Sequence, residues 1–385
     1  MRTRPPPQPA RKTTAKTSAK PARKTPRKTP RRRQASGPLA LDLALQGGGS
    51  HGAFTWGVLD RLLDDEGIVP AGVSGTSAGA LNAAVMATGW AEGGRTGAQA
   101  ALRAFWMDVA GTQSAYGGCF GAWAAPTKGL AAFNLEANPF YAWGQQFLRS
   151  FSPYQFNPGG SNPLRAVLSR HVRPQHLQSG PLSLFVTATA VRTGQPRVFD
   201  RRDISIDALL ASACLPQIFR AVEIDGQPYW DGGYSGNPAL WPLIYHTEAL
   251  DILLVKINPL HRPGTPDTPE EIADRVNEIT FNAGLVGEMR AIAFVQRLLD
   301  QGRVDPGEYK NLRLHMVADD AGLAPLHASS KLNTDRAFLE ALHALGRSAC
   351  ERWLLAHRAD LGQRSTLDMQ AEFLSPLAAS PLRPA

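Results

Sequence analysis

A glycine-rich loop and a glycine–serine turn lie close together near the start of the chain, each between a strand pattern and a helix pattern. Residues 39–45 alternate well enough for a strand, and Gly47-Gly48-Gly49 ends it. Apolar residues then recur at helical spacing over 52–65. A short apolar segment, 68–73, leads into the turn, and a second helix is predicted over 80–88. This order of strand, loop, helix, strand, sharp turn and helix predicts a parallel α/β sheet.

The rest of the chain continues the alternation of strands and helices. The predicted strands are 182–190, 251–257 and 312–317, the predicted helices are 269–300 and 332–357, and proline-rich 259–268 is a predicted loop. Residues 358–385 are weakly patterned, and we expect a loose C-terminal extension there.

Basic residues are concentrated in the first 37 residues. The 385-residue chain has a formal net charge of +8, but 13 Lys/Arg and no Asp or Glu lie in 1–37, which leaves 28 basic and 33 acidic residues in 38–385. Seven prolines and the lack of large apolar residues after Met1 predict a disordered tail. Such a tail can bind an anionic membrane, a granule surface or nucleic acid by counterion release, or it can simply increase solubility.

Other features concern the compartment of the protein. The three cysteines are too few and too far apart for a disulfide scaffold, which fits a reducing compartment. No run approaches the ~18 apolar residues of a membrane-spanning helix, and a secretory signal peptide is not indicated. We expect a cytoplasmic protein, either free or peripheral to a membrane or storage granule, although the basic start also leaves an organelle transit peptide open.

The turn between the second strand and its helix has the pattern Gly75-x-Ser77-x-Gly79. A serine on so sharp a turn exposes its hydroxyl, and flanking glycines permit the strained backbone. The N-terminus of the following helix points at the serine and favours developing negative charge there. The motif therefore predicts a nucleophilic serine at position 77.

The glycine-rich loop, Gly47-Gly48-Gly49-Ser50-His51-Gly52, admits two interpretations. Its successive N–H groups can form an oxyanion hole. Alternatively, Gly47-x-Gly49-x-x-Gly52 matches a dinucleotide-binding fingerprint. That fingerprint requires an acidic residue after the next strand, where this chain has Ala71-Gly72-Val73-Ser74-Gly75. The oxyanion interpretation is therefore favoured.

A third motif, Asp231-Gly232-Gly233, places a carboxylate at a tight backbone turn. Taken alone it is an ordinary turn aspartate. Together, however, the three motifs resemble the patatin-like phospholipase family, which has a glycine-rich oxyanion loop, a GxSxG nucleophile and a DG[G/A] aspartate in this order. Residues 211–216 resemble a further family segment, and the resemblance covers about 39–258.

The resemblance implies an α/β fold: a three-layer α/β/α patatin-like core with a mostly parallel central sheet, a helical lid insertion and the disordered basic tail. It implies one hydrolase domain over 38–357, with a motif-bearing core at about 39–258 and a C-terminal α/β part at about 259–357. It also implies hydrolysis of carboxylic esters of acyl lipids or phospholipids by a Ser–Asp dyad. No cofactor and no metal is expected, and the sequence indicates no oligomeric state.

Carried over to this chain, the nucleophile is Ser77 and its general base is Asp231. The oxyanion hole falls on Gly47, Gly48, Gly49 and Ser50, and the supporting positions are His51, Gly52, Gly75, Gly79, Gly232 and Gly233. His51 stands where the family usually has Lys or Arg. We therefore expect weaker electrostatic support for the loop, or support that depends on pH in the titration range of histidine.

A conventional Ser–His–Asp triad is the alternative to the dyad. Six histidines follow the aspartate, so the chain order Ser…Asp…His is available: His246, His261, His315, His327, His343 and His357. The α/β-hydrolase fold, however, places several strands before its nucleophile, and only two fit before Ser77. The dyad is therefore favoured.

Residues 105–156 contain 13 of the 30 aromatic residues of the chain. This segment is either a lid or acyl pocket that touches a lipid interface, or ordinary packing between helices. Two other functions stay open at this stage: a nucleotide-binding module that uses the glycine loop, and an anionic-surface-binding protein with an idle hydrolase core.

Overall fold

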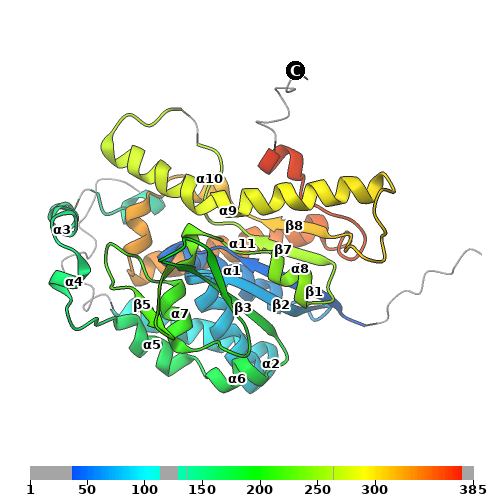
Figure 1. The fold of residues 1–385 in the computed structure, drawn as a ribbon, viewed down its shortest axis with the longest axis horizontal. Coiled ribbons are helices and arrows are strands. Elements are labelled where there is room, and N and C mark those ends of the chain that lie inside the picture. Colours follow the sequence, from blue (N-terminus) through cyan, green and yellow to red (C-terminus); the bar gives the residue numbers. More distant parts are fainter. Residues whose placement is uncertain (1–36, 113–128, 137, 263, 375–385) are drawn as a thin grey trace, which may run out of the picture. The chain divides into compact units, whose positions relative to one another are not determined.

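The computed structural model describes residues 37–112, 129–136, 138–262 and 264–374 (Figure 1). Contacts divide the chain into two units at Ser36 and Gly37. The predicted disordered tail lies outside the described residues except for Gly37, and the description below concerns the second unit.

A mixed sheet of eight strands forms the centre of this unit, in the order β5-β6-β3-β2-β1-β7-β8, with β4 paired to β3. The strands are β1 (Leu39–Leu45), β2 (Ile68–Thr76), β3 (Ser183–Ala190), β4 (Pro196–Phe199), β5 (Val222–Ile224), β6 (Gln227–Asp231), β7 (Asp251–Val255) and β8 (Arg313–Val317). The pairs β1–β2, β1–β7, β2–β3 and β7–β8 are parallel, whereas β4, β5 and β6 pair antiparallel. The predicted α/β class with a mostly parallel sheet is confirmed.

Helices cover both faces of the sheet (Figure 1). Their bounds are α1 (Gly52–Leu63), α2 (Ala78–Gly111), α3 (Pro139–Ser150), α4 (Pro153–Phe156), α5 (Pro163–His171), α6 (Pro174–Ser179), α7 (Ile206–Ser212), α8 (Trp241–His246), α9 (Pro269–Asp300), α10 (Asp320–Leu323) and α11 (Arg336–His357). Short 3-10 helices occur at Gly49–His51, Gly129–Phe133 (η4), Gly232–Tyr234 and Ala328–Leu332 (η6), and a π-helix at Gln370–Leu374.

The three layers follow from the alternation of apolar residues in the strands. In β7, Leu253 and Val255 belong to the core beneath α1, α2 and α11, whereas Ile252 and Leu254 belong to a second core beneath α8 and α9. A parallel strand that is buried on both faces needs apolar residues at every position, and β7 has them throughout.

Several element boundaries differ from those predicted. β1 is as expected, but the predicted helix over 80–88 is the start of α2, which continues to Gly111 across non-helical residues at Gly93 and Gly94. The antiparallel strands β4, β5 and β6 were not predicted. They have only three to five residues, too few for a period-2 pattern to be distinguished from a loop.

The C-terminal part up to residue 374 is not the loose extension that we expected. Leu361 and Phe373 are buried. The N–H of Thr366 donates to the carbonyl of Leu314 in β8, and Lys256 pairs with Glu372. Two widely spaced apolar anchors and an ion pair hold this segment, and such anchors leave no periodic pattern in the sequence. Residues 375–385 of the expected extension lie outside the described residues.

In the described part of the chain, no helix is both long and apolar enough to cross a bilayer.

Candidate active site

Ser77 occupies a strained turn between β2 and α2. Its backbone has φ 51° and ψ −126°, a conformation that non-glycine residues rarely adopt. The Ser77 N–H donates to Ser212 Oγ at 2.8 Å, and Ser212 Oγ in turn donates to the carbonyl of Thr187 at 2.6 Å. This relay fixes the turn to β3, so the side chain of Ser77 projects at the carboxyl end of the parallel strands.

Glycines allow the backbone to pass closely around Ser77. A Cβ on Gly47 would lie 2.7 Å from the Cβ of Ser77, and a Cβ on Gly79 would collide with the carbonyl of Leu45. Gly52 is equally confined, since a Cβ there would be 2.6 Å from the Cβ of Ala78. The glycine loop and the serine turn are therefore in direct contact, although Gly47 and Ser77 are 30 residues apart and Gly52 and Ala78 are 26 residues apart in the sequence.

The N–H groups of Gly48, Gly49 and Ser50 lie at the start of the 3-10 turn Gly49–His51. The first hydrogen bond of this turn runs from the His51 N–H to the Gly48 carbonyl at 3.2 Å, so the three preceding N–H groups have no partner within the turn. Gly49 has φ 57°, in the left-handed region that glycine tolerates.

Gly47 differs from the expectation that it belongs to the oxyanion hole. Its N–H donates to Asn237 Oδ1 at 2.6 Å, and its carbonyl accepts from Asn258 Nδ2 at 2.7 Å. Both polar groups of Gly47 are therefore used to fix the loop. The side chain of Gln46 adds a further brace, because its Oε1 accepts from the N–H groups of Ile257 and Asn258 at 2.9 Å.

Asp231 ends β6 and is 1% exposed. Its N–H donates to the carbonyl of Cys214 at 2.8 Å, and its Oδ1 accepts from the Gly233 N–H at 2.7 Å. Burial raises the pKa of this carboxyl to about 6, against the opposing effects of the Gly233 N–H, the side chain of Ser77 and the charge of Lys331. The Gly75–Gly79 turn and the Asp231 turn therefore meet: a Cβ on Gly232 would lie 3.0 Å from Thr76 Cγ2, and the side chain of Ser77 acts on the Asp231 carboxylate.

The two glycines after Asp231 are needed for close packing. A Cβ on Gly232 would collide with the carbonyl of Thr187, and a Cβ on Gly233 would collide with the ring of Phe281 in α9. The turn is thus held between β3 and α9, and this close packing accounts for the burial of the carboxylate.

Lys331 lies in η6 and is a half-buried cation at this site that sequence reasoning missed. Its Nζ donates to Asn258 Oδ1 at 3.0 Å and lies 5.8 Å from the ring centre of Phe281. Its carbonyl oxygen lies against Gly49, where a Cβ would collide with it. Burial lowers the pKa of Lys331, while the charges of Glu278, Asp274 and Asp231 raise it. Nothing around residue 331 marks it in the sequence, and only the fold brings it to the loop.

His51 is buried, and its Nε2 lies 2.8 Å from Ser330 Oγ. Burial, together with the charges of Lys331 and Arg262, lowers its pKa to about 3. His51 is therefore neutral over the whole physiological range, and the pH dependence expected from its titration near neutrality is wrong.

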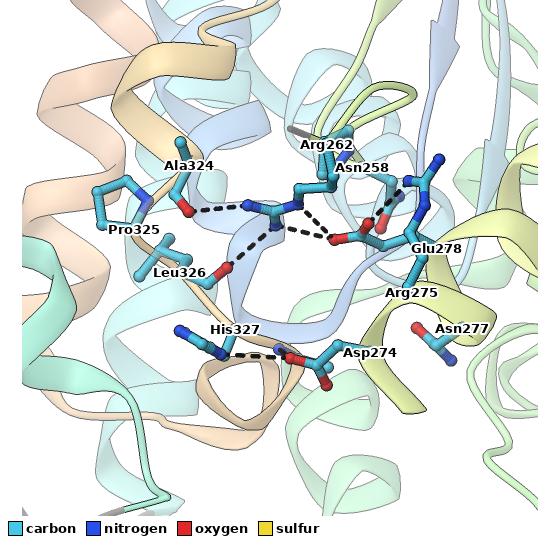
Figure 2. Close-up of polar contacts among 12 residues, drawn as sticks. Asn258, Arg262, Asp274, Arg275, Asn277, Glu278, Ala324, Pro325, Leu326 and His327 are labelled. Atoms are coloured by element: carbon cyan, nitrogen blue, oxygen red, sulfur yellow. Dashed lines mark hydrogen bonds and ion pairs between the residues drawn. The ribbon is translucent and has the colours of Figure 1, made fainter. Parts of the chain in front are cut away.

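A cluster of charged residues attaches α9 to the segment that precedes Lys331 (Figure 2). Arg262 bonds Glu278 at 2.8 Å and the carbonyls of Ala324 and Leu326 at 2.8 and 3.3 Å. Arg275 bonds the other oxygen of Glu278 at 3.1 Å. Buried Glu278 thus holds two arginines, and the cluster fixes the backbone that carries Lys331.

The six histidines that could have formed a triad are placed elsewhere. His315 bonds Asp251, His343 bonds Asp60, His327 pairs with Asp274, His357 lies near Asp360, His261 contacts the carbonyl of Glu372, and His246 stacks near Phe185. Among the contacts of the described residues, none joins any of these histidines to Ser77 or Asp231.

One group of residues has the composition of a metal site, which the sequence did not lead us to expect. Glu136, Asp274 and His327 place ligand-type atoms within 4.8 Å of one another. The hydrogen bond with Asp274 raises the pKa of His327, and Glu136 adds to this effect. Since all three side chains are partly exposed, an ion-pair cluster accounts for the arrangement without a metal.

The aromatic-rich segment divides into two parts, and its residues 113–128 lie outside the described ones. Phe105 and Trp106, on α2, are buried in the core. In contrast, Phe140 and Trp143 on α3 are 51% and 71% exposed. Packing therefore explains the first aromatics but not those of α3.

The sequence profile described as patatin-like phospholipase matches residues 43–244. No curated protein sequence matches the chain.

Among solved structures, the chain is similar to VipD from Legionella pneumophila, with 13% identity over 90% of this chain and 74% of that chain, at a TM-score of 0.35. It is also similar to the type III effector ExoU, with 16% identity over 81% of this chain, at a TM-score of 0.27. This chain covers 53% of that ExoU chain. For the ExoU–SpcU complex from Pseudomonas aeruginosa the identity is 18% over 88% of this chain and 75% of that chain, at a TM-score of 0.27.

These structural scores are low, so the assignment rests on the sequence profile. The profile spans more than half of the 385 residues and includes the glycine loop, Ser77 and Asp231. The chain therefore belongs to the patatin-like phospholipase family and is an ester-hydrolysing enzyme.

Proposed function

We propose that this enzyme cleaves carboxylic ester bonds of acyl lipids through an acyl-enzyme intermediate on Ser77, with Asp231 as the general base. The single observation that carries the proposal is the meeting of the Ser77 hydroxyl with a buried carboxylate whose pKa is raised to about 6. An ordinary aspartate is too weak a base for a serine hydroxyl, and burial makes this one stronger.

In the first half of the reaction, Ser77 Oγ attacks the ester carbonyl and its proton passes to the Asp231 carboxylate. The negative charge on the former carbonyl oxygen is received by the N–H groups of Gly48, Gly49 and Ser50. The tetrahedral intermediate then expels the alcohol, which takes the proton from Asp231. In the second half, Asp231 deprotonates a water that attacks the acyl-serine; the bond from the acyl carbon to Ser77 Oγ then breaks, Asp231 returns the proton to Ser77 Oγ, and the fatty acid is released.

Lys331 contributes to both halves in this proposal, although it does not touch the reacting atoms. Its charge favours the ionised form of Asp231. Its bond to Asn258, which in turn bonds the carbonyl of Gly47, supports the glycine loop from behind. Because His51 is neutral, Lys331 is the cation that provides this support.

The tight packing of the glycine loop supports the hydrolase over the nucleotide-binding alternative. A bound pyrophosphate would need free space over the loop, but Gly47 and Gly52 lie against the Ser77 turn.

For the basic segment 1–37 we propose peripheral attachment of a cytoplasmic enzyme to an anionic membrane, granule or nucleic acid.

Labelling with a fluorescent fluorophosphonate tests the function directly. An activated serine displaces fluoride from the probe and becomes covalently tagged. We expect the folded full chain to be labelled and peptide mapping to place the tag on Ser77. If the folded chain is not labelled and does not hydrolyse short-chain esters, the core is idle, and a thermal-shift screen with dinucleotides should then be tried.

The acid limb of the pH–rate profile should report the titration of Asp231. Since the base must be ionised, kcat/KM for a soluble ester should fall as pH drops below about 6. The titratable groups that face Asp231 are Cys214, Tyr234 and Lys331. Burial raises the pKa of Cys214 to about 12 and raises that of Tyr234, so neither explains a limb near pH 6.

His51→Gln is the control for this profile. With a pKa near 3, His51 does not titrate in this range, so the limb should stay in place in this variant. A limb that disappears when His51 is replaced would assign the titration to the histidine and refute the role of Asp231.

A further inference from the structure

We infer that the exposed apolar side chains of α3, α4, η6 and the first half of α9 form one docking surface that inserts into a phospholipid membrane and brings the active site to its substrate. This docking surface is defined by Phe140, Trp143, Phe151, Tyr154, Ile272, Val276, Ile279 and Leu332. The inference deepens the proposed function and rests on it, because it states how a lipid reaches Ser77.

The exposed apolar residues are concentrated on the elements around the site. Among the described residues, 12 large apolar side chains are exposed, and the eight of the docking surface are included in that number. Trp143 is 71% and Val276 58% exposed. Single exposed apolar residues need no explanation, but a concentration of them next to the site of a lipid hydrolase indicates an interface.

The segment before α3 is bonded directly to the wall of the site that contains Lys331. The N–H of Leu135 donates to Ser329 Oγ at 2.9 Å, and Asn333 Nδ2 donates to the carbonyl of Phe133 at 2.8 Å. Ser330, in the same turn, contacts His51 of the glycine loop. The residues just before α3 thus contact the turn that holds His51, the neighbour of Ser50 in the glycine loop.

The far end of the aromatic segment is attached to the opposite wall, which contains Asp231. In α4, the ring of Tyr154 lies 4.9 Å from the Arg220 guanidinium, and its hydroxyl accepts from the Ala221 N–H at 3.4 Å. The carbonyl of Arg220 accepts from the thiol of Cys214, whose own carbonyl holds the N–H of Asp231. α3 and α4 therefore connect the two walls of the site.

The first half of α9, which also packs against the Asp231 turn, supplies the remaining part of the docking surface. Ile272, Val276 and Ile279 are spaced by four and three residues and so share one helix face. On another face of the same turns, Asn277 lies 3.4 Å from Lys331 Nζ, and Phe281 packs against Gly233. Figure 1 shows α3, α4 and the start of α9 at the same end of the body.

The charge around α3 and α4 fits a membrane rather than a basic protein partner. Residues 137–199 contain six arginines and no Asp or Glu, although Arg165, Arg170 and Arg197 pair with Asp207, Asp108 and Asp203 from other parts of the fold. Arg220, beside Tyr154, bonds the carbonyl of Pro158 and, among the described residues, pairs with no carboxylate. Exposed aromatic side chains beside an arginine that pairs with no carboxylate are suited to the interface of a phospholipid bilayer, where apolar rings are buried and cations meet phosphate.

The experiment compares two readouts in the full chain: binding to phosphatidylcholine vesicles at raised salt, and hydrolysis of a soluble short-chain ester. Raised salt weakens attachment by the basic tail and leaves apolar insertion in place. We expect the double variant Phe140→Ser/Trp143→Ser to bind vesicles about tenfold more weakly and to lose a similar factor in phospholipid hydrolysis. Its hydrolysis of the soluble ester should be unchanged.

The soluble ester separates this inference from the proposed function. If wild type cleaves no ester, the proposed function fails. If wild type cleaves the soluble ester but the double variant binds vesicles as tightly as wild type, the docking inference fails. Val276→Ser gives a second test on a different helix. Tyr245→Ser and Leu355→Ser are matched controls, since these residues are 74% and 79% exposed outside the docking surface, and their vesicle binding should equal that of wild type.

A second copy of the chain is the competing occupant of the docking surface. Light scattering after size exclusion decides this point. A dimer that dissociates in Phe140→Ser/Trp143→Ser while vesicle binding persists would overturn the inference.

Discussion

Ser77→Ala and Asp231→Asn should each lower the rate of ester hydrolysis by about 10⁴-fold or more and should abolish fluorophosphonate labelling. The first change deletes the nucleophile, and the second puts an amide, which cannot accept the serine proton, in place of the carboxylate. Because the two groups act as one unit, the double variant should be no slower than the single variants. Burst and steady-state kinetics on a soluble ester would measure these losses.

Both variants should keep the fold, and the pH dependence of stability makes this testable. The pKa of Asp231 is raised from 3.8 to about 6 in the folded state, so ionising this carboxyl costs more in the folded than in the unfolded chain. The resulting loss of stability begins as pH rises above 3.8 and is complete above about pH 6. Asp231→Asn should therefore melt at the same temperature as wild type or higher at pH 8. A lower melting temperature would mean that lost activity reflects unfolding.

Ser179→Ala and Asp225→Asn are matched controls, since both side chains are exposed and lie outside the site. Their activity should equal that of wild type. Full activity in Ser77→Ala or in Asp231→Asn would disprove the proposed dyad.

Lys331→Met should reduce kcat/KM for a soluble ester at pH 7 by about tenfold and move the acid limb of the profile to higher pH. The ammonium favours the ionised form of Asp231, so its removal raises the pKa of that carboxyl and leaves less base at neutral pH. A loss of the Asn258 contact alone would lower the rate equally at all pH values. The pH–rate profile therefore distinguishes a charge effect from a packing effect.

Two further lysine variants sharpen this test. Lys331→Arg retains the charge, and its acid limb should stay near that of wild type even if the rate falls. Lys310→Met removes a part-buried lysine that bonds the carbonyl of Leu243 and acts on Asp42 rather than on Asp231. Its profile should be unchanged. An unshifted limb in folded Lys331→Met would refute the electrostatic role.

The local geometry around Ser77 could be predicted from the sequence alone. Gly47, Gly75 and Gly79 are glycines because no Cβ fits against the turn, so close backbone contacts leave a recognisable motif. The parallel sheet could be predicted for a similar reason: a strand buried on both faces, such as β7, needs an unbroken apolar run. A structural requirement that restricts several residues close together in the chain, such as glycines around a tight turn or apolar residues throughout a buried strand, can be recognised in a single sequence.

The charges at the site, in contrast, depend on how the chain folds. Burial keeps His51 neutral, and the cation whose charge acts on Asp231 is Lys331, 280 residues from His51 in the sequence. Likewise, the N–H of Gly47 is used by Asn237, so the loop motif did not tell which of its N–H groups remain available. Burial and long-range contacts set the pKa of a group and the partners of a donor, and neither follows from the residues beside it in the chain.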